Sequence, residues 1–129
     1  MIPDDVTRIK AHAFHGCDSL TSVTITDSVT KIDGSAFCGC RSLTSVTIGC
    51  GITSIGARAF TGDVKLEYID LTSYGTDKAF PTLYNTNAFD YCSTDTANGT
   101  FEIRVPAGRK DELAAMSNWS TYADNIVEV

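Results

Sequence analysis

Residues 29–48 read VTKIDGSAFCGCRSLTSVTI, and the same order of apolar positions occurs 23 residues earlier, at 6–25, and 23 residues later, at 52–71. The Ala-Phe pair marks the register, because Phe14, Phe37 and Phe60 are evenly spaced. A fixed period with apolar residues at fixed offsets is typical of a solenoid, in which each coil packs on the next. The sequence therefore predicts a repeat solenoid.

The first two units end in Leu-x-x-Val-x-Ile and the third in Leu-x-x-Ile-x-Leu. This ending predicts a short strand with one buried side because apolar and polar residues alternate. Gly, Ser and Asp around the Ala-Phe pair favour turns or 3₁₀ segments on the opposite side of the coil. The third unit has Asp63 where the first two have Cys17 and Cys40.

After Leu71 the register shifts, and two Ala-Phe pairs compete as the fourth anchor. We choose Phe89 over Phe80, because Cys92 follows Phe89 at the repeat offset and Tyr84 stands where Ile55 stands in the third unit. This choice inserts six residues, which we place within Tyr74–Leu83. A second insertion is expected at Ser93–Gly99, before a strand at Phe101–Val105.

Two regions follow from this register: a solenoid of about four coils at residues 1–105 and a closing segment at residues 106–129. The sequence of the closing segment predicts a short helix over Lys110–Asn118 and a last strand over Ile126–Val129. Its apolar side chains suit the closure of an open solenoid end. Ile2 aligns with the end of a strand, so we expect the chain to be the C-terminal portion of a longer protein.

The repeat Ile-x-x-x-Ala-Phe-x-x-Cys-x-x-Leu-x-x-Val-x-Ile resembles the BspA-like (treponemal-type) class of bacterial leucine-rich repeats. The ending Ile103–Pro106, followed by a short helix and Asn118–Ser120, is similar to the C-terminal cap of that class. This resemblance implies a right-handed, curved solenoid with a short-stranded parallel sheet on its concave side and a small α/β cap. It also implies a secreted or surface-attached bacterial protein, and some members of the class are associated with adhesion to host molecules.

The composition argues against two classes of binding partner, nucleic acids and membranes. A net charge of −6 and a pI near 4.6 argue against a nucleic-acid partner, which needs a basic surface, and weakly against an anionic membrane. No apolar run reaches the ~18–20 residues of a membrane-spanning helix. We therefore expect neither nucleic-acid binding nor membrane insertion of these residues.

The five cysteines suggest disulfides or metal ligation, but their positions favour packing. Cys17, Cys40 and Cys92 share one repeat position and are expected to stack as a buried ladder of thiols. Cys38 and Cys40 form a Cys-x-Cys motif, which is weak evidence for a zinc site. His15 and His12 are the nearby candidate ligands. Cys50 is expected to be an exposed or half-exposed free thiol, and no metal or cofactor is predicted.

A catalytic role has little support in the sequence. A nucleophile needs an adjacent base and a third group that orients the base. His12 and His15 lie on the Ala-Phe side, and neither has a partner at a suitable spacing. Paired acids such as Asp111-Glu112 are typical of turns and helix starts. We predict that the protein is not an enzyme, and a metal- or thiol-dependent activity is a distant alternative.

The polar strand positions between buried residues form the best candidate surface. The first two coils present mainly Ser and Thr, which is typical of a solvated sheet face, and side-chain diversity begins at Tyr68. Tyr74, Phe80 and Tyr84 either extend this surface through the inserted loop or cover the inserted coil; both interpretations stay open. The predicted contact residues are Tyr68, Asp70, Thr72, Tyr74, Glu102 and Arg104.

These features favour a non-catalytic module that binds a protein or a glycan. The alternative is a structural cap or stalk that only positions other domains. We also expect the N-terminal end to self-associate, because Val6, Ile9 and Phe14 are expected to be uncovered there.

Overall fold

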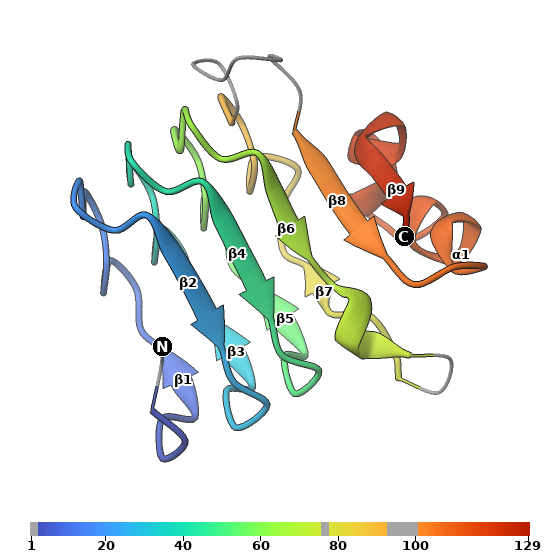
Figure 1. The fold of residues 1–129 in the computed structure, drawn as a ribbon, viewed down its shortest axis with the longest axis horizontal. Helices are drawn as coiled ribbons and strands as arrows, with labels where there is room; N and C mark the ends of the chain where they lie inside the picture. The colour runs from blue at the N-terminus through green and yellow to red at the C-terminus, as the bar shows by residue number, and fades with distance from the viewer. Residues whose placement is uncertain (1–2, 76–77, 93–100) are drawn as a thin grey trace.

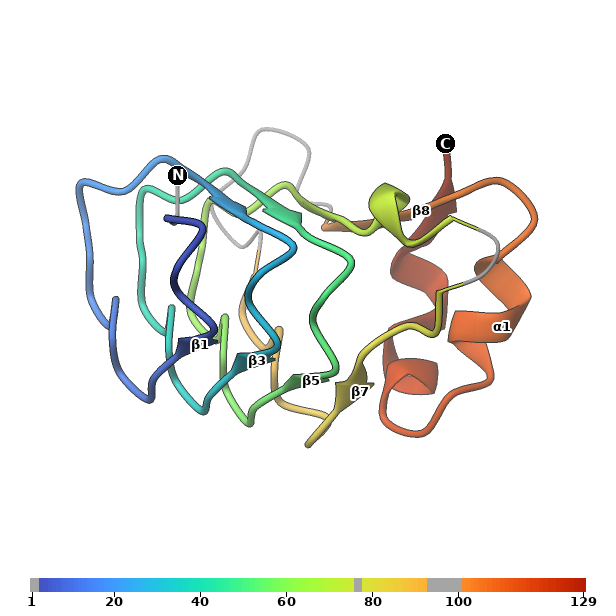
Figure 2. The same ribbon diagram turned by 90° about the horizontal axis from the view of Figure 1, so that it is seen from below.

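The computed structural model describes residues 3–75, 78–92 and 101–129, and it contains two parallel sheets on opposite sides of a solenoid (Figures 1 and 2). The wide sheet has the strand order β2-β4-β6-β8-β9, and the narrow sheet has the order β1-β3-β5-β7. The wide-sheet strands are β2 (Ser22–Ile25), β4 (Ser45–Ile48), β6 (Tyr68–Asp70), β8 (Glu102–Val105) and β9 (Ile126–Glu128). The narrow-sheet strands are β1 (Arg8–Ile9), β3 (Lys31–Ile32), β5 (Ser54–Ile55) and β7 (Thr82–Leu83).

The repeat register places equivalent residues side by side in the wide sheet. Val23 pairs with Val46, and Val46 pairs with Ile69, so each buried position continues from coil to coil. The exposure pattern of β2 alternates exposed and buried residues, as the sequence predicts for a strand with one buried side. Parallel pairing across a solenoid therefore turns a sequence period into a continuous apolar core.

The narrow sheet was not predicted from the sequence. The side opposite the wide sheet was expected to contain turns or 3₁₀ segments. In the described repeats it contains turns around the Ala-Phe pairs and, before them, two-residue strands. Each of these strands presents one polar residue outward and buries one apolar residue, such as Ile32 at 1% exposure. Two residues are too few to show an alternation in the sequence.

The Phe residues of the Ala-Phe pairs form a continuous stack through four coils. Phe14 and Phe37 lie 5.1 Å apart between ring centroids, Phe37 and Phe60 lie 5.3 Å apart, and Phe60 and Phe89 lie 5.6 Å apart. Full burial of such a side chain contributes about 1.5–3 kcal/mol. The stack confirms Phe89 as the fourth anchor. Phe80 instead packs against Tyr74, with 5.6 Å between ring centroids.

The fourth coil departs from the expected register at one position. Leu83, not Tyr84, pairs with Ile55 and fills the core position, with 3% of its surface exposed. Tyr84 is 77% exposed, so its assignment to the Ile55 position was wrong. The interval from Leu83 to Phe89 is six residues, whereas that from Ile55 to Phe60 is five, so one inserted residue lies after β7.

The closing segment adds a helix and a strand to the end of the wide sheet. The helix α1 (Lys110–Ala114) is shorter than predicted, and the 3₁₀ helix η2 (Trp119–Asn125) follows it. Asn118 has a left-handed backbone (φ 68°), which ends the helical path between the two. Trp119 and Tyr122 cover Phe89 at 5.9 and 5.2 Å, so this segment closes the Phe stack.

The first coil is partly covered. Ile9 is buried at 3% exposure, so its predicted exposure was wrong, whereas Val6 and Phe14 are half-buried. The expectations for Ile2 and for the insertion at Ser93–Gly99 lie outside the described residues. The curvature and handedness implied by the resemblance stay predictions.

Candidate binding surface

The outward face of the wide sheet changes character along the solenoid. On β2 and β4 it presents small hydroxyl side chains, and these come from Ser22, Thr24, Ser45 and Thr47. On β6 and β8 it presents larger groups, because Tyr68 lies beside Glu102 and Asp70 beside Arg104 in the ladder. The predicted contact residues of the two strands therefore lie together in space.

Tyr68, Glu102 and Arg104 form one contact cluster. The Arg104 guanidinium lies 3.6 Å from the centroid of the Tyr68 ring, which is a cation–π contact. Its Nε also donates a 2.9 Å hydrogen bond to Glu102 Oε1. Both charged side chains keep more than a third of their surface exposed, so solvent screens the ion pair and its net contribution to stability is small. The cluster therefore presents an ordered charged and aromatic surface to solvent.

Asp70 and Thr72 have a local structural role as well as their position on this face. Asp70 Oδ1 accepts hydrogen bonds from the Thr72 backbone amide at 2.8 Å and from Thr72 Oγ1 at 2.6 Å. A short acidic side chain that binds an amide two residues later stabilises a turn. Here the turn leads into the 3₁₀ helix η1 (Thr72–Tyr74). Replacing Asp70 would therefore change the backbone as well as the surface.

Tyr74 does not belong to the surface, and its predicted contact role was wrong. Its side chain is completely buried, and its hydroxyl donates to the carbonyl oxygens of Gly49 and Ile52, each at 3.0 Å. Burial raises the pKa of this hydroxyl. Phe80 is also buried, at 4% exposure. The interpretation that these aromatic residues cover the inserted coil is therefore correct for both.

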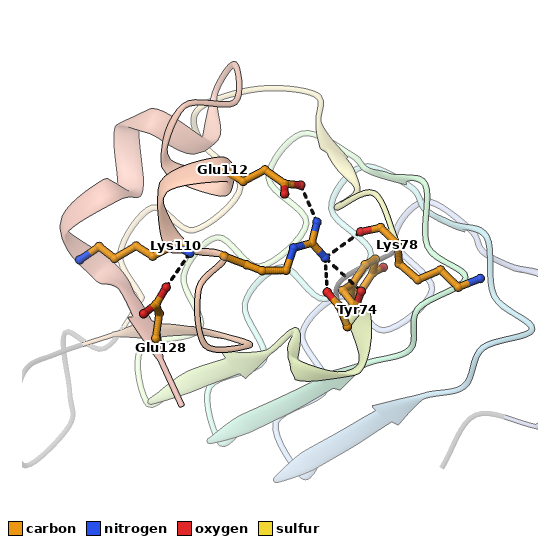
Figure 3. Close-up of polar contacts among 7 residues, drawn as sticks. Tyr74, Lys78, Lys110, Glu112 and Glu128 are labelled. Carbon is orange, nitrogen blue, oxygen red and sulfur yellow. Dashed lines mark hydrogen bonds and ion pairs between the residues drawn. The ribbon is translucent and has the colours of Figure 1, made fainter.

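Arg109 fixes the inserted segment to the closing segment. Its Nη1 donates to the carbonyl oxygens of Tyr74, Gly75 and Lys78, and its Nη2 donates to Glu112 (Figure 3). The guanidinium also lies 4.1 Å from the centroid of the Phe80 ring. Arg109 was not predicted from the sequence, because an Arg before a short helix is typical of an exposed position.

The cysteines do not form disulfide bonds. All five cysteines are free; Cys40 is buried, and Cys17 and Cys92 are half-buried, so the predicted buried ladder holds fully only at Cys40. Cys50 is half-buried and free, as expected. Burial raises the pKa of Cys40 to about 12 and also raises that of Cys92. A thiol with a raised pKa is a poor nucleophile and a poor metal ligand at neutral pH.

His12 and His15 stack on one another with 5.6 Å between ring centroids, and Cys38 is half-buried. Within the described ranges, no group of three or more His, Cys, Asp or Glu side chains is arranged to hold a metal ion. Across the same ranges, none of the helices has the length and apolar character needed to cross a membrane.

Comparison with known proteins identifies the repeat. The family model described as the BspA type leucine rich repeat region matches residues 1–104 in six copies. No curated protein matches the chain.

Proposed function

The chain belongs to the BspA-type leucine-rich-repeat family, and from this we propose that it is a non-catalytic module that binds a protein or a glycan. Repeats of this family are generally binding scaffolds, and they are typical of secreted and cell-surface proteins. We place the protein in that setting, with a role in adhesion to extracellular molecules. The contact surface is the outward face of β6 and β8.

The observation that carries this proposal is the Tyr68–Arg104–Glu102 cluster. Aromatic and Arg side chains are enriched among the residues that contribute most to binding at protein interfaces. The cation–π contact and the ion pair hold Arg104 in one orientation before a partner arrives, which lowers the entropy lost on binding. The hydroxyl-bearing face of β2 and β4 lies beside the cluster and contributes a polar rim.

The test is a binding screen of the whole chain against immobilised extracellular-matrix proteins and an array of oligosaccharides. Variants Tyr68→Ala and Arg104→Ala are expected to lose binding to any partner found, with an unchanged melting temperature. Thr24→Ala serves as the matched control, because Thr24 is exposed on the same face but on β2. Equal binding by all three variants would reject this surface.

A second function is favoured by the burial of Tyr74 and Phe80. The inserted segment places its aromatic side chains in the core and its carbonyl groups on Arg109, so it stabilises the junction with the closing segment. On this view the chain is a structural cap or stalk that positions other domains. This function would be favoured if the chain binds none of the molecules in the screen while a longer protein that contains it does bind.

A further inference from the structure

The narrow sheet has a groove on its outward side that the proposed function does not use. The groove has a volume of about 500 Å³ and runs across β1, β3, β5 and β7, on the side of the molecule opposite the wide sheet (Figure 2). Its walls include Arg8, Lys31, Ser54, Thr82 and Tyr84. We propose that this groove binds an acidic oligosaccharide, with Arg8 and Lys31 at one end and Tyr84 at the other.

Two cations lie side by side at the first end of the groove. Arg8 and Lys31 are direct partners in the parallel ladder between β1 and β3. Like charges at opposed positions of a sheet repel one another, so this arrangement costs stability unless an anion offsets it. Asp33 offsets part of the charge, because its Oδ2 lies 2.8 Å from Arg8 Nε. Lys31 has no ion-pair partner among the described residues.

The net charge at this end of the groove is opposite in sign to the net charge of the whole chain. Arg8, Lys31 and Asp33 together carry a charge of +1, whereas the chain carries −6. A local positive potential on an acidic protein attracts an anion and repels the protein's own acidic surface. The complementary ligand therefore carries carboxylate or sulfate groups.

The other end has a different chemistry. Tyr84 is 77% exposed, and its ring can pack against the apolar face of a pyranose. Ser54 and Thr82, between the two ends, continue the row of Arg8 and Lys31 with hydroxyl groups that can bind sugar hydroxyls. Three strand spacings of ~4.8 Å separate β1 from β7, so the row extends roughly 14 Å and fits a short oligosaccharide.

Small residues keep the groove open. Ala11, Gly34 and Ala57 occupy equivalent repeat positions and line it without long side chains. At Gly56, a Cβ atom would lie 2.4 Å from the Gly34 nitrogen, so the coils approach too closely there for a side chain. The combination of a cationic end, a hydroxyl row and an exposed aromatic ring favours a sugar acid over an acidic peptide, which has no need of the ring.

The test is an NMR titration of the whole chain with four probes at low ionic strength. The probes are a heparin-derived hexasaccharide, an oligogalacturonate, neutral cellohexaose and a polyglutamate peptide. We expect both acidic sugars to bind, to shift the amides of β1, β3, β5 and β7, and to weaken as salt screens the charges. Binding of the neutral sugar, or equal binding of polyglutamate, would overturn the proposal.

Lys31→Ala and Tyr84→Ala are each expected to weaken the binding of the acidic sugars about tenfold, which corresponds to roughly 1.4 kcal/mol. Lys65→Ala is the matched control, because Lys65 is exposed and lies outside the groove. An equal loss in the Lys65 variant, or no loss in the Tyr84 variant, would reject the groove as the site. Arg104→Ala separates this site from the wide-sheet surface, because it is expected to leave the acidic-sugar titration unchanged.

Discussion

Asp63 Oδ1 accepts a 2.8 Å hydrogen bond from the backbone amide of Cys40, and both residues are completely buried. Asp63 stands in the third coil at the position that Cys40 occupies in the second. The thiols of Cys40 and Cys92 approach the carbonyl oxygens of Phe14 and Phe60 in the preceding coils, at 3.1 and 3.2 Å. Asp63 thus makes a different hydrogen bond from the cysteines, because it accepts from an amide of the preceding coil, and it brings a carboxyl group into the core.

Asp63 is expected to make the protein less stable as pH rises. Burial raises the pKa of Asp63 to about 8, well above the ordinary range of an Asp carboxyl, and this effect outweighs the lowering by the amides of Cys40 and Gly39. Below the pKa values of both the unfolded and the folded chain, the carboxyl is protonated in both states, so it imposes no charge penalty. Between them the unfolded chain loses the proton while the folded protein keeps it, so the free energy of unfolding falls by about 1.4 kcal/mol per pH unit. Above the folded pKa this contribution becomes constant.

The measurement is urea denaturation at several pH values from about 4 to about 9, with Asp63→Asn as the comparison. Asn keeps the oxygen that accepts from Cys40 and has no acidic proton, so its stability is expected to change less over this range. Asp63→Cys restores the repeat residue and is expected to be more stable than the parent above pH 8 by several kcal/mol. A parallel pH dependence in all three proteins would contradict the role of Asp63.

Within the described residues, each of the first three coils turns twice through a left-handed backbone, and the fourth coil does so once. The second prediction concerns the residues at these turns. Ser35 has a φ of 59° and Gly39 has a φ of 72°. A left-handed conformation costs a residue with a Cβ about 1–2 kcal/mol, partly offset by the larger chain entropy that Gly loses on folding. The equivalent residues in the other coils are His12 and Arg58 at the first position, and Gly16, Gly62 and Tyr91 at the second.

Ser35→Gly is therefore expected to raise the free energy of unfolding by about 0.5–1 kcal/mol. Gly39→Ser is the matched reverse change and is expected to lower it by a similar amount. No atom lies within 4 Å of a Cβ placed on Gly39. The effect of Gly39→Ser on stability therefore comes from backbone strain and not from a steric clash. Thermal or urea unfolding measures the change in the free energy of unfolding for each variant. A change in the same direction for both variants would contradict the explanation.

The third prediction concerns the junction between the inserted segment and the closing segment. Arg109→Ala removes three hydrogen bonds to carbonyl oxygens, of which the one to Tyr74 is buried and the other two are partly buried, so it is expected to cost about 2–4 kcal/mol. Arg109→Lys is expected to recover only part of this loss, because an ammonium lacks the planar fork of the guanidinium. Arg41→Ala, at an exposed position, is the control and is expected to change stability by less than about 0.5 kcal/mol.

The repeat could be read from the sequence because each coil buries the same positions against its neighbours. The positions of the buried Val and Ile residues follow directly from that period, whereas Phe89 lies outside it and was identified by Cys92 at the repeat offset. The narrow sheet could not be predicted, because a two-residue strand such as Lys31–Ile32 has no alternation of its own. Its partners come only from the stacking of the coils.

The burial of Tyr74 depends on distant residues. The sequence places this aromatic side chain in an insertion, where exposure and burial are both reasonable. In the structure its hydroxyl binds the carbonyl oxygens of Gly49 and Ile52, and its own carbonyl oxygen accepts from Arg109, 35 residues later. Contacts between two irregular segments leave no periodic signal in a single sequence. Tyr68 and Arg104, by contrast, could be assigned to one surface from the sequence, because both lie on regular strands.

The last prediction concerns the open edge of the first coil. Val6 and Phe14 are half-buried and line a depression of about 280 Å³, whose walls also include Arg8 and Lys10. The edge strand β2 of the wide sheet carries no charged residue, and an uncharged strand edge can pair with a second copy of the same chain. We expect Val6→Glu to weaken this self-association in analytical ultracentrifugation, because it places a charge in the contact. Val129→Glu, at the other end and 63% exposed, is expected to have no effect. If the unaltered chain stays monomeric at every concentration, this edge does not associate.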